Sequence, residues 1–212
     1  MRNNIYFAIC IAIMGFTSCN SDDNTVNQSI DTEVITSGEL DLSNYVAVGN
    51  SLTSGYTDGA LFKSGQQNSW TKILSDQFAL AGGGVFKIPY MNDNLGGLVL
   101  GGNVISENRL YFNGKTPERL SGNPSNEIGV SLTGFFNNMG VPGAKSFHLL
   151  VEGYGNVAGV ASGKSNPYFV RFASSPNASI LGDVLAQNPT FFTLWIGNND
   201  ILSYATSGGV GN

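Results

Sequence analysis

The chain has 212 residues, of which 10 are Lys or Arg and 15 are Asp or Glu, so its formal net charge at pH 7 is −5. This acidic balance, with only 12% charged residues, argues against nucleic-acid binding, which needs a basic surface. The 28 glycines follow no fixed period, so we expect no internal repeat but a domain rich in loops.

The N-terminus has the pattern of an export signal. One basic residue, Arg2, precedes an apolar run over 5–16, which is too short to span a bilayer but typical of a secretory signal. Thr17 and Ser18 stand directly before Cys19, and this order resembles a bacterial lipobox. The resemblance implies cleavage before Cys19 and a diacylglycerol on its sulfur.

Acidic residues after the cysteine bear on localisation. Asp22 and Asp23 resemble the surface-export signal of Bacteroidota lipoproteins. We therefore expect a lipoprotein signal peptide over 1–18 and a protein anchored to the outer membrane, at the cell surface, through lipidated Cys19. An ordinary signal peptide with an incidental cysteine stays open as the alternative.

The rest of the chain divides into a tether and one domain. Cys10 and Cys19 are the only cysteines, so the mature body has none free for a disulfide. Residues 19–41 are polar and lack apolar periodicity, which predicts a flexible tether. The domain proper is expected over 42–212, a length that suits a single core.

The first predicted element of this domain is a strand over 45–48, rich in Val and Tyr. The sequence Gly-Asn-Ser-Leu over 49–52 follows at once, and small turn-forming residues come next. This layout delivers the Ser51 hydroxyl to the carboxyl end of a strand, where backbone N–H groups of the following turn can face a developing oxyanion. Ser51 is therefore a candidate nucleophile.

An amphipathic helix is predicted next, over 69–81, and a run of glycines ends it. The residues expected on its apolar face are Trp70, Ile73, Leu74, Phe78 and Ala81. Residues 85–134 are predicted as loops with a hairpin around Asn113-Gly114, forming an insertion beside the site. The Gly-rich stretch 96–102 does not match a dinucleotide fingerprint, and neither a cofactor nor a metal is expected.

Residues 135–138 lead into a second polar segment, Asn-Met-Gly-Val-Pro-Gly over 138–143. A short helix is predicted over 144–150. Residues 153–176 are predicted as a second loop-rich insertion, locally extended over 168–172.

The last elements are a helix over 179–187, ended by Pro189, and a strand over 190–196. The strand is an almost continuous apolar run, as expected when both faces are buried. It leads into a third segment, Gly-Asn-Asn-Asp over 197–200. Strands that alternate with helices in this way favour a parallel sheet in an α/β fold.

The segments that contain Ser51, Gly143 and Asn199 resemble, in order, character and spacing, blocks I, II and III of the SGNH (GDSL-type) hydrolases. The resemblance implies a three-layer α/β/α sandwich with a parallel sheet in flavodoxin-like order, and a serine ester hydrolase that forms an acyl-enzyme. It assigns Ser51 as nucleophile, with the Gly143 backbone N–H and the Asn199 side-chain amide as oxyanion donors. From the residues alone, Gly143 is also explained by a turn and Asn199 by a helix cap.

The chain departs from the family pattern in two ways. Asn50 stands where the family more often has Asp, a change expected to affect catalysis little. The family's Asp-x-x-His motif, which carries the catalytic acid and base after two further strands, does not occur in this sequence. His148, the sole histidine, is expected to be structural or solvent-facing. We therefore expect the N-terminal portion of a longer hydrolase, with the strand over 190–196 left at a sheet edge.

The resemblance leaves the substrate open among carboxylesters, acetylated glycans and acyl lipids, and the two insertions are expected to select among them. The alternative is a non-catalytic surface lipoprotein that binds glycans or another ligand on the same scaffold. Aromatic residues that could offer stacking surfaces for it are Trp70, Trp195, Tyr154 and Tyr168. Both tryptophans, however, lie in apolar patterns and are expected in the core.

Overall fold

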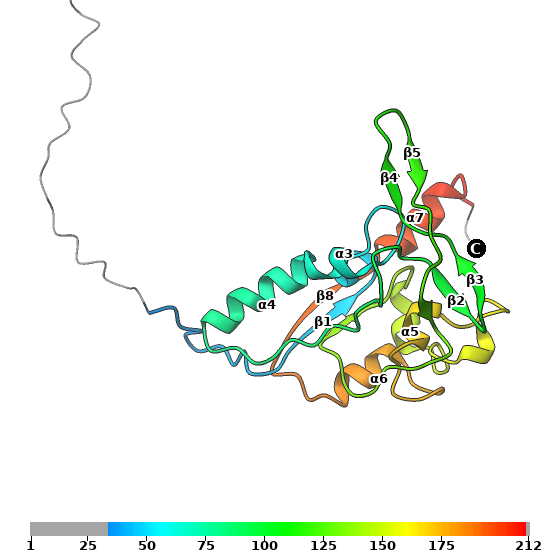
Figure 1. Ribbon diagram of the computed structural model, residues 1–212. Coiled ribbons are helices and arrows are strands. Elements are labelled where there is room, and N and C mark those ends of the chain that lie inside the picture. Colours follow the sequence, from blue (N-terminus) through cyan, green and yellow to red (C-terminus); the bar gives the residue numbers. More distant parts are fainter. Residues whose placement is uncertain (1–33, 211–212) are drawn as a thin grey trace, which may run out of the picture. The chain divides into compact units, whose positions relative to one another are not determined.

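The structure is a computed structural model that describes residues 34–210 (Figure 1). The predicted signal peptide over 1–18, the lipidation site Cys19 and the acidic pair Asp22 and Asp23 lie outside the described residues. Leu42 is the first buried side chain in the described part of the chain. Within residues 34–210, no helix combines the length and the apolar character needed to cross a bilayer.

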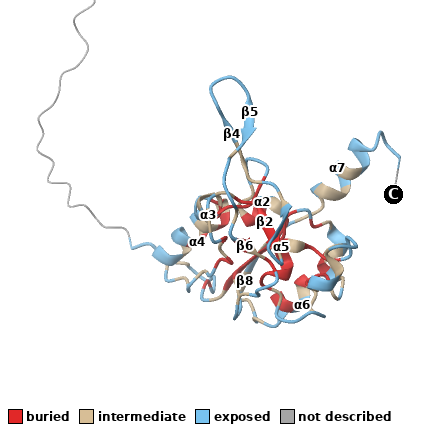
Figure 2. Ribbon diagram, turned by 45° about the vertical axis from the view of Figure 1, so that its right-hand side comes forward, coloured by how far each residue is buried: buried red, intermediate tan, exposed pale blue. Residues whose placement is uncertain are grey.

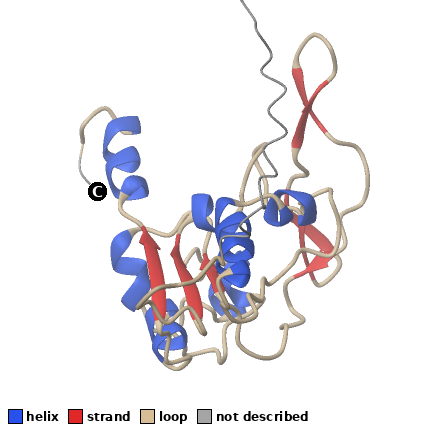
Figure 3. Ribbon diagram, turned by 90° about the vertical axis from the view of Figure 1, so that its left-hand side faces the viewer, coloured by secondary structure: helices blue, strands red, loops and turns tan. Residues whose placement is uncertain are grey.

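Three parallel strands form the sheet that positions the candidate site. They are β1 (Tyr45–Gly49), β7 (Asn138–Gly140) and β8 (Phe191–Trp195), in the order β7-β1-β8. All three run in the same direction, so their carboxyl ends share one edge (Figure 3). The strands predicted over 45–48 and 190–196 are confirmed as β1 and β8. Strand β7 lies within the second polar segment over 138–143, where no strand was predicted. In the sheet, β7 and β8 flank β1.

Side chains on both faces of β1 are buried. Val46 and Val48 belong to a hydrophobic core that includes Ile180 and Val184 of α6 (Ile180–Leu185). Tyr45, which alternates with them along the strand, packs its ring edge-on against Phe78 at 5.1 Å. The architecture is therefore mixed α/β, with helices and with small parallel and mixed sheets.

Helix α4 (Trp70–Leu80) confirms the predicted amphipathic helix, but its buried face is shifted from the predicted one toward Thr71 and Ser75. Ser69 caps it by accepting a hydrogen bond from the Lys72 N–H. Ile73, expected on the buried face, is 56% exposed, whereas Thr71 and Ser75 are buried. The Thr71 hydroxyl donates to the Thr53 carbonyl at 3.1 Å, so a small polar residue holds the helix close to its neighbours.

The first insertion forms a second sheet and a hairpin. The sheet has the order β3-β2-β6 and consists of β2 (Leu98–Leu100), β3 (Asn103–Ser106) and β6 (Asn126–Glu127). The hairpin of β4 (Leu110–Phe112) and β5 (Pro117–Arg119) projects from the domain and confirms the prediction around Asn113-Gly114 (Figure 1). The β2–β3 hairpin was not predicted, although two glycines with positive φ, Gly101 and Gly102, form its turn.

The second insertion contains short helical turns. Helix α5 (Pro167–Val170) lies where an extended segment was predicted over 168–172, and that prediction is wrong. The physical reason is local: Asn166 caps the helix and Pro167 occupies its first turn, where a missing N–H costs nothing. The helix predicted over 144–150 is a 3₁₀ helix, η1 (Ser146–Leu150), and another, η2 (Val157–Gly159), precedes α5.

Strand β8 is an edge strand in the described part of the chain, since it pairs with β1 alone. Phe192 is 61% exposed and Leu194 54% exposed, so the strand is not buried on both faces as its apolar run predicts. Helix α7 (Asn198–Thr206), which follows, contains no buried residue (Figure 2). The position at a sheet edge agrees with the expectation that this strand lacks a neighbour.

The aromatic residues considered for ligand stacking fall into two groups. Trp195 is 49% exposed and its ring lies 5.8 Å from that of the half-buried Trp70. The expectation that both tryptophans are core residues is therefore wrong. Tyr154 and Tyr168 are buried, so their rings do not present a stacking surface.

Candidate functional site

Ser51 is the first residue of α2 (Ser51–Ser54) and follows β1 after a single residue, Asn50. Asn50 caps this short helix: its Oδ1 accepts a hydrogen bond from the Leu52 N–H at 3.1 Å. Ser51 is half-buried, and its hydroxyl has no hydrogen-bond partner among residues 34–210. The hydroxyl therefore lies where the sequence places it, at the carboxyl end of a parallel strand.

Two glycines allow the elements around Ser51 to approach closely. A Cβ on Gly49 would lie 2.2 Å from Thr53 Oγ1 and 2.3 Å from the Trp195 carbonyl oxygen. A Cβ on Gly140 would lie 2.3 Å from the Ser54 amide nitrogen. No side chain fits at such distances, so glycine at these positions brings α2 against the ends of β7 and β8.

The segment around Ser51 is hydrogen bonded to both other predicted segments. The Val141 N–H donates to the Gly49 carbonyl at 2.9 Å, and the Asn50 N–H donates to the Trp195 carbonyl at 3.2 Å. The Asn50 side-chain amide also donates to Asn198 Oδ1. Because Asn50 Oδ1 already accepts from Leu52, its Nδ2 must be the atom that faces Asn198, which settles the orientation of both amides.

The second and third segments are also joined to each other. Asn199 Nδ2 donates to the Ala144 carbonyl at 2.8 Å. The Asp200 carboxylate accepts from the Ser146 N–H at 2.9 Å and from the Ser146 hydroxyl at 2.7 Å. These hydrogen bonds lower the pKa of Asp200 below its usual value. The structure therefore brings the segments of Ser51, Gly143 and Asn199 to one edge of the sheet.

Gly143 lies in a tight turn. The Ala144 N–H donates to the Val141 carbonyl at 3.1 Å, Pro142 is the second residue of the turn, and Gly143 has a φ of 80°. These are the features of a type II turn, in which the third residue needs a positive φ. The turn leaves the Gly143 N–H unused, and this group has no acceptor among residues 34–210. A Cβ here would meet only Asn166 Nδ2, at 4.0 Å, so the space beside Gly143 is open.

Asn199 is the second residue of α7 and does not cap it. The N-cap of α7 is Gly197, with a φ of 99° and no side chain to accept a hydrogen bond. The helix-cap interpretation of Asn199 is therefore wrong. A side-chain amide carries two hydrogens, and the Ala144 carbonyl takes one of those on Asn199.

His148 is held by contacts with Lys145 and Tyr154. Its Nδ1 accepts a hydrogen bond from the Lys145 N–H at 2.9 Å, and its ring stacks on that of Tyr154 at 4.5 Å. Burial, with a smaller contribution from Lys145, lowers the pKa of His148 despite the opposing charge of Asp200. Among the described residues His148 makes no hydrogen bond with Ser51.

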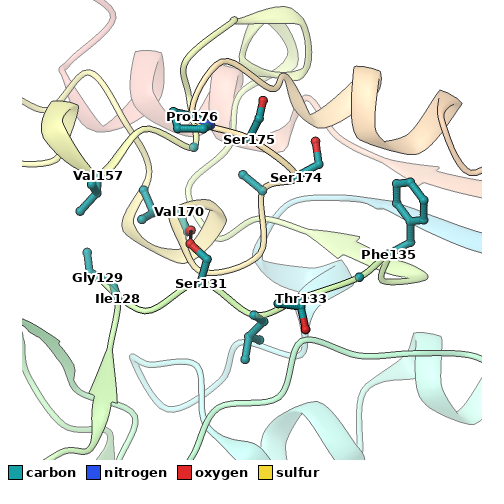
Figure 4. Close-up of a pocket in the computed structure, with 14 residues that line it drawn as sticks. Ile128, Gly129, Ser131, Thr133, Phe135, Val157, Val170, Ser174, Ser175 and Pro176 are labelled. Carbon is teal, nitrogen blue, oxygen red and sulfur yellow. Dashed lines mark hydrogen bonds between the residues drawn. The ribbon is translucent and has the colours of Figure 1, made fainter.

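A cavity of about 430 Å³ lies between the two insertions (Figure 4). Ile128, Ser131, Thr133 and Phe135 line it from the first insertion and its end, and Val170 and Ser175 line it from the second. No ionisable side chain lines this cavity. Within the described range, no group of three His, Cys, Asp or Glu residues is arranged to hold a metal ion.

Three asparagines at the site have contacts that the sequence did not predict. Asn50 and Asn198 join the first and third segments, and Asn166 donates to the Pro142 carbonyl at 2.8 Å. An available signal was the pair Asn166-Pro167, since Asn before Pro is a helix-start pattern.

The chain matches no family model, no curated protein and no solved structure.

Proposed function

We propose that the protein is a serine ester hydrolase of SGNH type that forms its acyl-enzyme on Ser51. One observation carries this proposal: the three predicted segments are hydrogen bonded to one another, and the Ser51 hydroxyl in the first of them has no partner among the described residues. Three polar segments that converge from distant parts of a chain on one strand edge are typical of a catalytic site.

The proposed chemistry starts with attack of Ser51 Oγ on the carbonyl carbon of an ester. The proton of Ser51 passes to a base, and the carbonyl oxygen becomes an oxyanion that the Gly143 N–H and the Asn199 amide stabilise. Loss of one such donor typically costs about 3 kcal/mol of transition-state stabilisation. The base then returns the proton to the leaving alcohol, and water hydrolyses the acyl-enzyme. We expect this base in an Asp-x-x-His motif of the complete protein.

The three-layer α/β/α arrangement is part of the same proposal. It is supported by β1, whose alternate side chains contact α4 through Tyr45 and α6 through Val46 and Val48. The strand order β7-β1-β8 also agrees with the start of a flavodoxin-like sheet.

We further propose that the substrate is an ester-bearing small molecule, an acetylated glycan or an acyl lipid at the cell envelope. Lipidation at Cys19 would hold the enzyme at the outer membrane, on the cell surface. The cavity between the insertions does not bear on this choice, because neither Ser51 nor Gly143 nor Asn199 lines it. No cofactor enters the proposed reaction.

The proposal is tested by ester hydrolysis with the protein expressed from its complete gene. Ser51→Ala should lower kcat for a short p-nitrophenyl ester by about 10³-fold or more, because the nucleophile is lost. Ser64→Ala is the matched control, since Ser64 lies in the first turn of α3 (Lys63–Gln67) as Ser51 does in α2. Hydrolysis that survives Ser51→Ala, or that falls equally in both variants, would contradict the proposal.

A non-catalytic ligand-binding protein is the second candidate. The observation that favours it is the exposed Trp195 beside Trp70, since exposed aromatic rings stack on sugars and other planar faces. This function predicts glycan binding that Trp195→Ala abolishes and Ser51→Ala leaves intact. The serine-hydrolase proposal predicts that Trp195→Ala leaves Ser51-dependent hydrolysis in place.

A further inference from the structure

Asn166 is a buried asparagine whose side chain uses both of its polar atoms. Its Oδ1 accepts from the N–H groups of Tyr168 at 2.9 Å and Phe169 at 3.3 Å, and so caps α5. Its Nδ2 donates to the Pro142 carbonyl at 2.8 Å and to the Tyr154 hydroxyl at 3.2 Å. Because Oδ1 must face two N–H donors, the amide has one orientation, and Nδ2 must face Pro142.

The Pro142 carbonyl belongs to the same peptide unit as the Gly143 N–H. A trans peptide is planar, and its C=O and N–H point in opposite directions. A hydrogen bond that fixes the Pro142 carbonyl therefore also fixes the direction of the Gly143 N–H. Asn166 lies on one side of this peptide, so the Gly143 N–H points to the other side.

The turn alone does not fix this peptide. Type I and type II turns share the hydrogen bond between their end residues, here Val141 and Ala144, and differ by a flip of the central peptide. Pro142 suits both turns, and glycine at position 143 adopts either sign of φ. The Asn199 contact holds the Ala144 carbonyl, which belongs to a different peptide unit. The central peptide of the turn is Pro142–Gly143. Among the described residues, only Asn166 makes a hydrogen bond to this peptide.

We infer that Asn166 is a positioning residue that locks the Pro142–Gly143 peptide in the type II orientation and so presents the Gly143 N–H to the oxyanion. The role of the Gly143 N–H at an oxyanion rests on the proposed function, whereas the control of the peptide orientation by Asn166 is independent of it. The second insertion, which carries Asn166, thereby becomes part of the support of the catalytic site.

Substitution with aspartate separates the two roles of Asn166. Asn166→Asp keeps an oxygen that caps α5, since Asp and Asn cap helices about equally well, but removes the donor to Pro142. Asn166→Ser also keeps a capping oxygen, on a side chain too short to reach Pro142, and serves if the aspartate variant does not fold. Asn156→Asp is the matched control: Asn156 caps η2 through its Oδ1, and its Nδ2 has no partner among residues 34–210.

Two readouts test the inference. In the complete protein, Asn166→Asp should lower kcat for a p-nitrophenyl ester by about 10–10²-fold with little change in KM, because a donor needed only in the transition state is mispositioned. In NMR spectra, residual dipolar couplings and the φ-dependent coupling of Gly143 should report a reoriented N–H in Asn166→Asp and Asn166→Ser. Asn156→Asp should change neither readout.

The outcomes are distinguishable from failure of the proposed function. If the wild-type protein shows no Ser51-dependent hydrolysis but Gly143 reorients in the Asn166 variants alone, the positioning role stands and the hydrolase proposal falls. If the Gly143 N–H keeps its orientation in the folded Asn166 variants, the inference is overturned, whether or not the protein hydrolyses esters.

Discussion

Asn50 and Asn198 are joined through their side-chain amides, across a sequence separation of 148 residues. Asn50 is fully buried, and its other side-chain atom caps the helix that begins with Ser51. The residue directly before the proposed nucleophile therefore contacts both the start of α2 and the start of α7.

Asn50→Ala should destabilise the protein by about 2–3 kcal/mol, because a helix cap is lost and a buried amide is left without its partner. Asn50→Asp should cost less than about 1 kcal/mol at neutral pH, since the carboxylate still caps α2 and a flipped Asn198 amide can donate to it. Urea unfolding measures both changes. Equal losses in the two variants would show that the Asn50–Asn198 contact does not contribute as described.

Gly49→Ala should be among the most destabilising single changes in the domain. The added methyl would lie 2.3 Å from the Trp195 carbonyl oxygen, so backbone must move, at a cost of about 3 kcal/mol. Gly129→Ala is the control, because the nearest atom, Glu127 Oε1 at 3.1 Å, is the end of a flexible side chain. Thermal unfolding should separate the two variants clearly. A Gly49→Ala protein as stable as Gly129→Ala would contradict the close approach of α2 to β8.

Asp93 should make the first insertion sensitive to acid. Burial raises the pKa of Asp93, but hydrogen bonds from Ser125, Gly96 and Leu95 together lower it below its ordinary 3.8. The ionised carboxylate therefore stabilises the fold fully above pH 3.8, and this contribution is lost as the pH falls through the lower folded-state pKa.

Asp93→Asn tests this assignment with little change of shape. At pH 7 the variant should be less stable by about 1–3 kcal/mol, because the Ser125 N–H and hydroxyl lose a charged acceptor. Its unfolding free energy should fall less than that of the wild type between pH 5 and pH 3. Parallel pH dependence in the two proteins would mean that Asp93 does not contribute to acid sensitivity.

The edge of β8 should promote self-association of the 212-residue chain. Phe192 is 61% exposed on a strand that has one hydrogen-bonding side unpaired among the described residues, and such edges pair with other chains. Phe192→Lys should reduce concentration-dependent association, measured by sedimentation velocity. Phe112→Lys is the control, since Phe112 is 68% exposed on the hairpin of β4 and β5. If both variants reduced the association equally, exposed apolar side chains in general would cause it, and the prediction for the β8 edge would be wrong.

The local patterns of the sequence predicted the elements that position the site. Local patterns identify three of these elements. Apolar, β-prone runs mark β1 and the strand over 190–196, and the Ser69 cap with an amphipathic period marks α4. The sequence also placed Ser51 and the third segment after strands, whereas the second segment contains its strand, β7, instead of following it. The carboxyl ends of parallel strands meet at one edge, so their convergence follows from the topology.

Other features depend on contacts between distant residues. The buried face of α4 is set by the hydrogen bonds of Thr71 to Thr53 and Asn138, which no apolar period encodes. Trp195 is exposed on a strand at the edge of the sheet, where fewer packed elements cover the two faces than in the middle of a sheet, and the apolar run does not encode that position. The link of Asn166 to Pro142 joins an insertion to the site, and hydrophobic patterns carry no information on such a polar contact.

The central claim is that Ser51 is a nucleophile. A fluorophosphonate reacts covalently with an activated serine, and mass spectrometry of the digested complete protein locates the adduct. We predict one phosphonyl group on the peptide that contains Ser51, retained in Ser64→Ala and absent in Ser51→Ala. A protein that hydrolyses esters while its Ser51 stays unlabelled, or that carries the label on another serine, would contradict the account.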